Sequence, residues 1–273
     1  MGDYGQGVSS LSVQAPGSNP PSSVTDSDEI SVLVTGFGPF KSNLVNASYL
    51  IASSLPSSFT FSPTKDPDAT PRRVSIHVHP SPIPVAYSTV STTIPAITDD
   101  YVKTHGRRPD IILHMGIAGM RKFYSVETKA HRDGYLMSDI KGRAGYEDGE
   151  KQWKELDLPL LLKAGPAAES ESSAKGHLNP RAPDDRFLDA WKTFCPPETD
   201  VRISTDAGRY LCEFIFYTSL AVAYQGGHDR NITFLHVPAT CLDEDIDLGK
   251  EVAIALIKAL VTSWSDEQVP SDA

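Results

Sequence analysis

Short apolar runs rich in β-branched residues alternate along the chain with longer stretches in which apolar residues recur at helical spacing. The first run, 30–34, ends at Gly36, and the stretch 207–224 is apolar on nearly every side, as in a buried helix. This alternation predicts an α/β fold, a three-layer α/β/α sandwich on a largely parallel, mixed open sheet. The expected strands are 30–34, 74–79, 110–115, 123–130, 201–204 and 232–237, and the expected helices are 46–55, 85–104 with an interruption near Pro95, 187–194, 207–224 and 247–264.

Three segments lack such a pattern. Residues 1–29 are rich in Gly, Ser, Pro and Asp and predict a disordered N-terminal arm. Residues 57–72 predict a loop, and 146–185, which includes the low-complexity stretch 164–174, predict a flexible insertion. We therefore expect one α/β domain over 30–265, followed by a tail at 266–273.

Composition narrows the function classes. The chain has 273 residues and a formal net charge of −10, which disfavours nucleic acid as a partner. No apolar run reaches the roughly 18–20 residues of a membrane span, and no signal-peptide pattern begins the chain. The 3 cysteines show neither CxxC spacing nor the Cys/His spacing of a zinc site. We expect a cytoplasmic protein with free thiols and with neither metal nor cofactor.

A glycine turn follows the first predicted strand, at Gly36-Phe37-Gly38-Pro39-Phe40. It lacks the third glycine of a dinucleotide-binding loop, and Pro39 removes a backbone N–H, so nucleotide binding is disfavoured. Phe37 and Phe40 remain as two large aromatic side chains at the carboxyl edge of a strand, where open α/β sheets bind ligands. From spacing alone, a hydrophobic plug and a ligand contact are equally good interpretations.

Cys212 is the candidate nucleophile. It lies where the strand at 201–204 leads into the helix at 207–224, with Ser204, Thr205 and Asp206 as N-cap candidates. The positive end of the helix dipole would favour the thiolate there. The alternative is a cysteine buried as a small apolar side chain. Cys195 and Cys241 have no comparable helix entry.

A nucleophilic cysteine needs a base, and His236 is the best candidate because it ends a predicted buried strand just before Pro238. Glu127 is a carboxylate within a β-forming segment and would orient the imidazole. From the residues alone, an exposed strand face or an edge strand is the favoured interpretation of Glu127.

Four segments resemble, in order, the motifs of the pyroglutamyl peptidase type I family of cysteine peptidases. They are 30–40, 114–121 leading into 126–130, 204–212 and 234–238. The resemblance covers about 30–264 and implies a Glu127, Cys212 and His236 triad, with Phe37 and Phe40 lining the pocket for pyroglutamate. It implies an omega peptidase that hydrolyses the amide after the N-terminal pyroglutamate of peptides through a thioester, without a cofactor.

The chain departs from the family pattern at four positions: Met120, Arg132, Glu213 and Ala239. Many members carry glycine at the first, asparagine at the second and third, and an aromatic residue at the last. The departures suggest a diverged, eukaryotic-like member. An alternative is therefore a non-catalytic or altered-specificity protein on the same fold that binds another small amide or peptide N-terminus.

Overall fold

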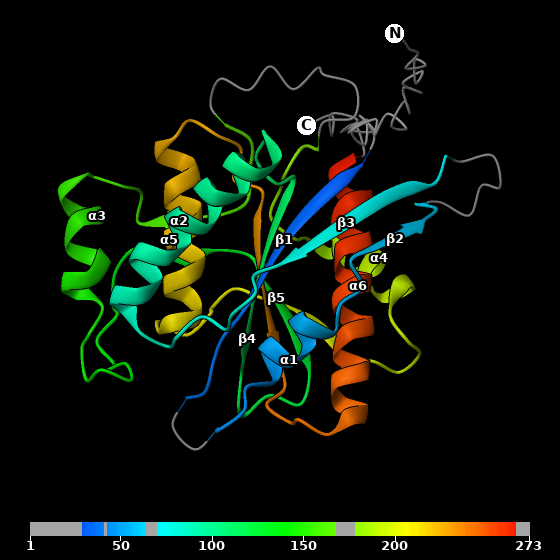
Figure 1. Cartoon of the computed structure of the whole chain (residues 1–273), viewed down its shortest axis with the longest axis horizontal. Coiled ribbons are helices and arrows are strands. Elements are labelled where there is room, and N and C mark those ends of the chain that lie inside the picture. The colour runs from blue at the N-terminus through cyan, green and yellow to red at the C-terminus, as the bar shows by residue number, and fades with distance from the viewer. Residues whose placement is uncertain (1–28, 41–42, 64–69, 168–177, 266–273) are drawn as a thin grey trace, which may run out of the picture.

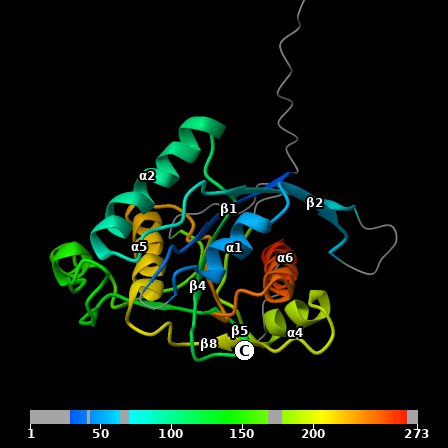
Figure 2. The same cartoon turned by 60° about the horizontal axis from the view of Figure 1, so that its bottom comes forward.

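The structure is a computed structural model that describes residues 29–40, 43–63, 70–167 and 178–265 (Figure 1). The predicted arm at 1–29, except Glu29, and the predicted tail at 266–273 lie outside the described residues. Helices cover both faces of a central sheet, so the predicted three-layer α/β/α sandwich is confirmed (Figure 2).

The central sheet has 7 strands within the described residues, in the order β2-β3-β1-β4-β9-β5-β8. Neighbours pair in parallel except at β2/β3 and at β5/β9, so the sheet is mixed and largely parallel, as expected. The strands are β1 (Ile30–Gly36), β2 (Ser58–Phe61), β3 (Arg72–Val78), β4 (Ile111–Ile117), β5 (Tyr124–Glu127), β8 (Val201–Ser204) and β9 (Ile232–Val237). A small second sheet pairs β6 (Ala130–His131) with β7 (Leu161–Leu162).

Two groups of helices sandwich the sheet (Figure 2). One face is covered by α2 (Tyr87–His105) and α5 (Leu211–Gln225). Helix α3 (Lys151–Glu155), which follows a π-helical turn at Tyr146–Glu150, packs against α5 through Trp153. The other face is covered by α1 (Ala47–Ser54), α4 (Asp185–Phe194) and α6 (Asp243–Ser265).

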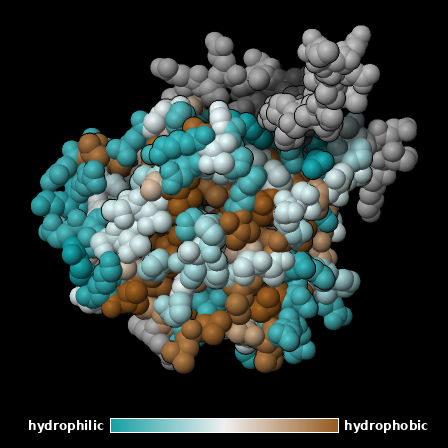
Figure 3. Space-filling model, in the orientation of Figure 1, coloured by the Kyte–Doolittle hydropathy of each residue, from teal (hydrophilic) through white to brown (hydrophobic). Residues whose placement is uncertain are grey.

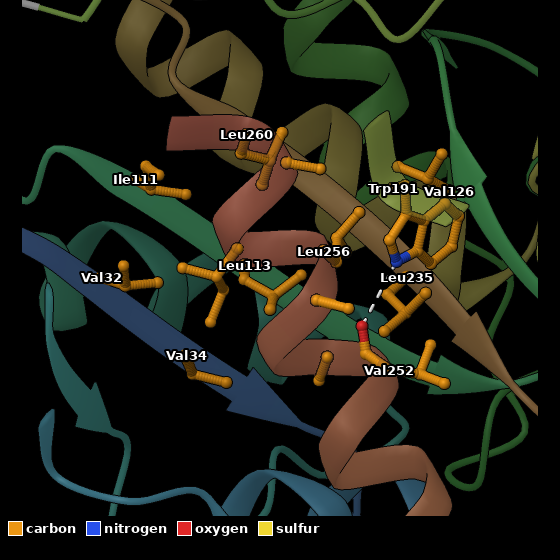
Figure 4. Close-up of a cluster of buried hydrophobic side chains, with 14 of the residues drawn as sticks. Val32, Val34, Ile111, Leu113, Val126, Trp191, Leu235, Val252, Leu256 and Leu260 are labelled. Atoms are coloured by element: carbon orange, nitrogen blue, oxygen red, sulfur yellow. Dashed lines mark hydrogen bonds between the residues drawn. The ribbon is translucent and has the colours of Figure 1, made fainter. Parts of the chain in front are cut away.

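Successive side chains of each buried strand alternate between the two faces of the sheet, so each strand contributes to both apolar layers. In β1, Val32 and Val34 face the α6 side, whereas Leu33 faces the α5 side. Figure 4 shows the α6 side, where the apolar stripe of α6 packs on β1, β4 and β9. Trp191 of α4 fills the end of this layer and donates its indole N–H to the Val252 carbonyl at 3.3 Å.

The predicted insertion is partly wrong. Residues 146–162 contain the π-helical turn, α3 and β7, and Trp153, Leu158 and Leu162 are buried against the α5 layer. Charged residues interrupt the apolar ones throughout 146–157, so no helical or strand period revealed this packing. The stretch 168–177 lies outside the described residues.

Other boundaries also differ. Strand β2 lies within the stretch predicted as loop, and the predicted strand 123–130 splits into β5 and β6. Helix α2 continues through Pro95 because its buried stripe, which includes Val90 and Ile94 before the proline and Tyr101 after it, packs along its length.

Candidate functional site

Glu127 and His236 form a buried hydrogen-bonded pair on neighbouring strands. In the antiparallel β5/β9 register, Glu127 lies opposite Phe234 and Ser125 lies opposite His236, so the pair is a same-face diagonal. His236 Nδ1 is 2.7 Å from Glu127 Oε1, and the residues are 4% and 1% exposed. Because a carboxylate only accepts hydrogen bonds, Nδ1 carries the proton and Nε2 is the basic nitrogen.

Arg121 bonds the same oxygen of the Glu127 carboxylate as His236 does. Its Nη1 donates to Glu127 Oε1 at 3.1 Å and to Ser125 Oγ at 2.6 Å. Burial raises the pKa of Glu127, but His236, Ser204 and Arg121 together outweigh burial, and the pKa is lowered overall. Glu127 is therefore ionised, as an orienting carboxylate must be.

Cys212 is the second residue of α5 and lies over the same end of the sheet. A Cβ built on Gly116 would come 2.8 Å from Cys212 Sγ, and Gly116 is the β4 residue paired with His236 in β9. Glycine is needed at this point because any side chain would occupy the place of the thiol. The fold thus brings all three predicted catalytic residues to one face of the sheet.

The predicted thiolate is not what the environment of Cys212 favours. Burial, together with the charge of Glu127, raises the pKa of the Cys212 thiol to about 12. The helix entry also differs from the expectation. Tyr210 is the N-cap residue and makes no side-chain cap, whereas Ser204, Thr205 and Asp206 lie farther upstream. The thiol is neutral at rest.

The loop with Phe37 and Phe40 is fixed by the start of α1. Ser48 Oγ accepts the Phe37 N–H at 3.0 Å, and Asn46 Nδ2 donates to the Gly38 carbonyl at 2.8 Å. Phe37 is 3% exposed and packs in the α5 layer near Gly116. Phe40 is half-buried, and its ring centroid lies 5.5 Å from that of Tyr210, just before the nucleophile.

Exposed apolar side chains border this edge of the sheet. Figure 3 shows hydrophobic residues along the lower edge of the molecule, where β1 leads into α1 in Figure 1. Large apolar side chains stand exposed in the loop before α1 and in the segment after β6. These are Leu44, Val45, Leu136, Met137 and Ile140.

The four departures from the family pattern occupy different surroundings. Met120 is fully exposed at the surface. Arg132 bonds Asp133 and the Leu158 carbonyl, and Ala239 is half-buried after β9. Glu213 is fully buried beside Cys212 and contacts two other segments.

Sequence reasoning missed Arg121, Gly116 and Tyr210 as site residues. Arg121 and Gly116 fall within a recognised motif, but a charge in a loop and a glycine ending a strand have ordinary structural explanations. Only the structure shows which groups they contact.

Two further findings concern cofactors and membranes. Within the part of the chain that the structure describes, no group of three or more His, Cys, Asp or Glu side chains is arranged to hold a metal ion. None of the described helices has the length and apolar character needed to span a bilayer.

Comparison with known proteins identifies the family of the chain. No protein-family model matches it. Human pyroglutamyl-peptidase 1 is 31% identical over 213 residues, which cover 76% of this chain and 78% of the relative. The chain belongs to the pyroglutamyl peptidase family. The expected resemblance is confirmed.

More distant members agree. Pyrrolidone-carboxylate peptidase from Pyrococcus furiosus is 27% identical over 207 residues, covering 76% of this chain and 80% of the relative. The structure of pyrrolidone carboxyl peptidase from Thermococcus litoralis aligns with a TM-score of 0.57 at 18% identity, covering 88% of this chain and 99% of that one. This alignment supports the fold, which the family shares.

Proposed function

We propose that the protein is a cysteine-type omega peptidase that hydrolyses the amide after an N-terminal pyroglutamate, with Cys212 as nucleophile, His236 as acid and base, and Glu127 as the orienting carboxylate. Its substrates are N-terminally pyroglutamylated peptides. The named relatives favour this function over the non-catalytic or altered-specificity alternative.

The assignment of roles rests on one observation. The buried Glu127–His236 hydrogen bond lies next to Gly116, the β4 residue that Cys212 Sγ packs against and that pairs with His236. A buried carboxylate held ionised against an imidazole fixes the ring orientation and stabilises the imidazolium that forms in the reaction. A neutral thiol on a helix N-terminal turn completes the set required for nucleophilic acyl transfer.

The first half-reaction begins with a protonated thiol. His236 Nε2 takes the proton of Cys212 as the sulfur attacks a carbonyl carbon of the 5-oxoproline. This is the carbonyl outside the ring, which the scissile amide joins to the next residue. Backbone N–H groups of the first turn of α5 have no partner within the helix and are the natural donors to the oxyanion. His236 then protonates the leaving amine, the C–N bond breaks, and a pyroglutamyl thioester remains on Cys212.

Water completes the cycle. His236 takes a proton from water as the water oxygen attacks the thioester carbonyl, and the sulfur leaves with that proton. Free pyroglutamate is released and the neutral thiol is restored. In each step Glu127 stays ionised and stabilises the charged His236 ring.

The pyroglutamate ring is neutral and flat, so its pocket needs apolar surface rather than a carboxylate for a free ammonium. We place the ring between Phe40, whose ring is tilted against that of Tyr210, and Phe37, which lies near Gly116 and the thiol. Exposed apolar side chains around this edge suit the same neutral ligand.

A reducing compartment, the cytoplasm, fits this chemistry. Cys195, Cys212 and Cys241 are all free thiols. Acyl transfer requires the nucleophile to stay reduced.

The decisive assay uses a fluorogenic pyroglutamyl amide, with prolyl and glutaminyl amides as matched substrates. The prolyl amide keeps the ring but replaces the lactam with a charged amine, and the glutaminyl amide opens the ring. We expect turnover of the pyroglutamyl amide alone. Equal turnover of all three amides, or none of any, would refute the proposed specificity.

A further inference from the structure

Glu213 follows the nucleophile directly and is fully buried, yet its carboxylate bonds to groups outside α5. It is the one departure from the family pattern that lies against Cys212, and the mechanism above gives it no task. Its four donor groups belong to His131 in β6 and to Arg209 in the loop before α5.

The first partner is His131 of β6, four residues after Glu127. Its backbone N–H is 3.0 Å and its Nδ1 is 2.5 Å from Glu213 Oε1. The carboxylate therefore joins the helix that carries the nucleophile to the segment that carries the orienting acid.

The second partner is Arg209, whose backbone N–H donates to Oε2 at 2.7 Å and whose Nη1 lies 3.0 Å and 2.9 Å from Oε1 and Oε2. Arg209 has φ 48° and follows Gly208 at φ 95°. A left-handed backbone is unfavourable for a residue with a side chain, so it persists only where surrounding bonds hold it. The Glu213 carboxylate supplies such bonds just before Tyr210, Leu211 and Cys212.

We propose that Glu213 is a positioning residue for the reaction: its ionised carboxylate sets the first turn of α5 against β6, and so places the Cys212 thiol relative to the Glu127–His236 pair. This inference rests on the proposed function. The four groups that bond to the carboxylate are all donors and make 5 hydrogen bonds with it, so only a side chain that accepts at both oxygens fits. Glutamine would bring an NH₂ group against at least one donor.

A merely structural role for Glu213 predicts lower stability with unchanged chemistry, and Asp110 provides the matched control. Its carboxylate accepts the Ser31 N–H at 2.8 Å and Arg107 Nη1 at 2.7 Å, but at the amino ends of β1 and β4, away from Cys212. D110N therefore loses the same kinds of bond without touching the nucleophile's helix.

The test measures kcat and KM for the pyroglutamyl amide in E213Q and D110N, with the thermal midpoint of each. In E213Q, kcat should fall roughly 10- to 100-fold with KM within about 2-fold, because the thiol is displaced while the pocket is kept. D110N should keep wild-type kcat and KM.

A second readout follows the reactivity of the thiol itself. The charge of Glu213 contributes to raising the pKa of Cys212, after burial and Glu127. Iodoacetamide should therefore modify Cys212 faster in E213Q than in wild type, while hydrolysis is slower. Because loss of structure would expose the buried thiol and speed its alkylation as well, the rates are compared only where E213Q keeps the wild-type circular dichroism spectrum. Alkylation that is unchanged or slower in that folded variant would overturn the inference.

If E213Q does not fold, E213D decides, because it keeps an ionised acceptor one methylene shorter. We expect E213D to fold and to lose part of kcat at unchanged KM. Wild-type kcat in whichever variant folds, or an equal loss in D110N, overturns the role of Glu213. A wild-type enzyme that does not hydrolyse the amide overturns the proposed function instead.

Discussion

Phe37 and Phe40 lie three residues apart on one loop, but their surroundings differ. Phe37 is 3% exposed in the α5 layer, whereas Phe40 is half-buried beside Tyr210. Phe37→Ala should destabilise the fold by about 3–5 kcal/mol, because it empties a core position. Phe40→Ala should instead raise KM, with a loss of binding on the order of 1–3 kcal/mol.

Thermal melts and kinetics run on both variants check this difference. Phe40→Tyr should be milder than Phe40→Ala because it keeps the ring face. A stability loss in Phe40→Ala as large as that in Phe37→Ala, at unchanged KM, would show that Phe40 is a core residue and not a ligand contact.

The neutral thiol of Cys212 predicts a particular pH dependence of alkylation. Because its pKa is raised to about 12, the thiolate fraction should grow continuously as pH rises. The iodoacetamide rate at Cys212, followed by mass spectrometry of its peptide, should climb from about pH 6 to about pH 10 without a plateau. A rate independent of pH from about pH 6 upward would show a preformed thiolate and contradict the mechanism proposed here.

The limits of sequence reasoning are clearest at single residues. Cys212 and His236 stand out as candidates because each is of a reactive type and lies at a strand or helix end, and the structure brings them to one face of the sheet. Glu127 was ambiguous because burial depends on β9 and β8, which come from distant parts of the chain. The partners of Glu213 are no more visible, because His131 lies 82 positions away.

At the element scale, the segment after β6 is packed structure. Gly149, in the π-helical turn, lies so close to α5 that an added Cβ would come 2.6 Å from Phe214 Cζ. Gly149→Ala should therefore destabilise the protein by about 1–3 kcal/mol through overpacking. Chemical denaturation measures the change.

Gly119 offers a matched control, since a Cβ there meets nothing within 4 Å. Gly119→Ala should leave the denaturation midpoint unchanged. An unchanged midpoint in Gly149→Ala as well would mean that the segment is loosely held, as its composition first indicated.

Elements with a strong apolar period were predicted closely, and those held by tertiary contacts were not. Strand β9 matches its predicted range, since four of its six residues are large and apolar and only Thr233 and His236 are polar. Strand β2 alternates polar and aromatic residues, but it is only 4 residues long, lies between Pro56 and Pro63 and pairs only with β3, so the pattern was too short to distinguish it from loop. Helix α5 starts at Leu211 because Gly208 and Arg209 adopt left-handed backbone that ends the preceding loop.

For the whole molecule, burial of His114 predicts how stability depends on pH. His114 is 2% exposed, bonds Thr35 Oγ1 through Nδ1 at 2.7 Å, and has its pKa lowered by burial to about 3. Below about pH 6.5, the pKa of a histidine in the unfolded chain, the unfolded chain binds a proton at His114 that the native state does not bind. Stability is therefore complete above about pH 6.5 and falls as pH drops from there toward about 3.

Denaturant midpoints at about pH 7 and about pH 5 measure this effect, which is at most about 1.4 kcal/mol per pH unit for one histidine. His114→Gln should show a flatter slope. His228, whose pKa burial also lowers, is less enclosed, so His228→Gln should flatten the slope less. An identical slope in wild type and His114→Gln would assign the pH dependence elsewhere.

The role of Cys212 is tested most directly by kcat/KM for the pyroglutamyl amide in Cys212→Ala, beside Cys195→Ala and Cys241→Ala. Neither of the latter two residues belongs to the proposed site. We expect no measurable hydrolysis in Cys212→Ala with the circular dichroism spectrum of the wild type, and near wild-type kcat/KM in the other two. Retained hydrolysis in folded Cys212→Ala, or its loss in Cys195→Ala or Cys241→Ala, would contradict the assignment of Cys212 as the nucleophile.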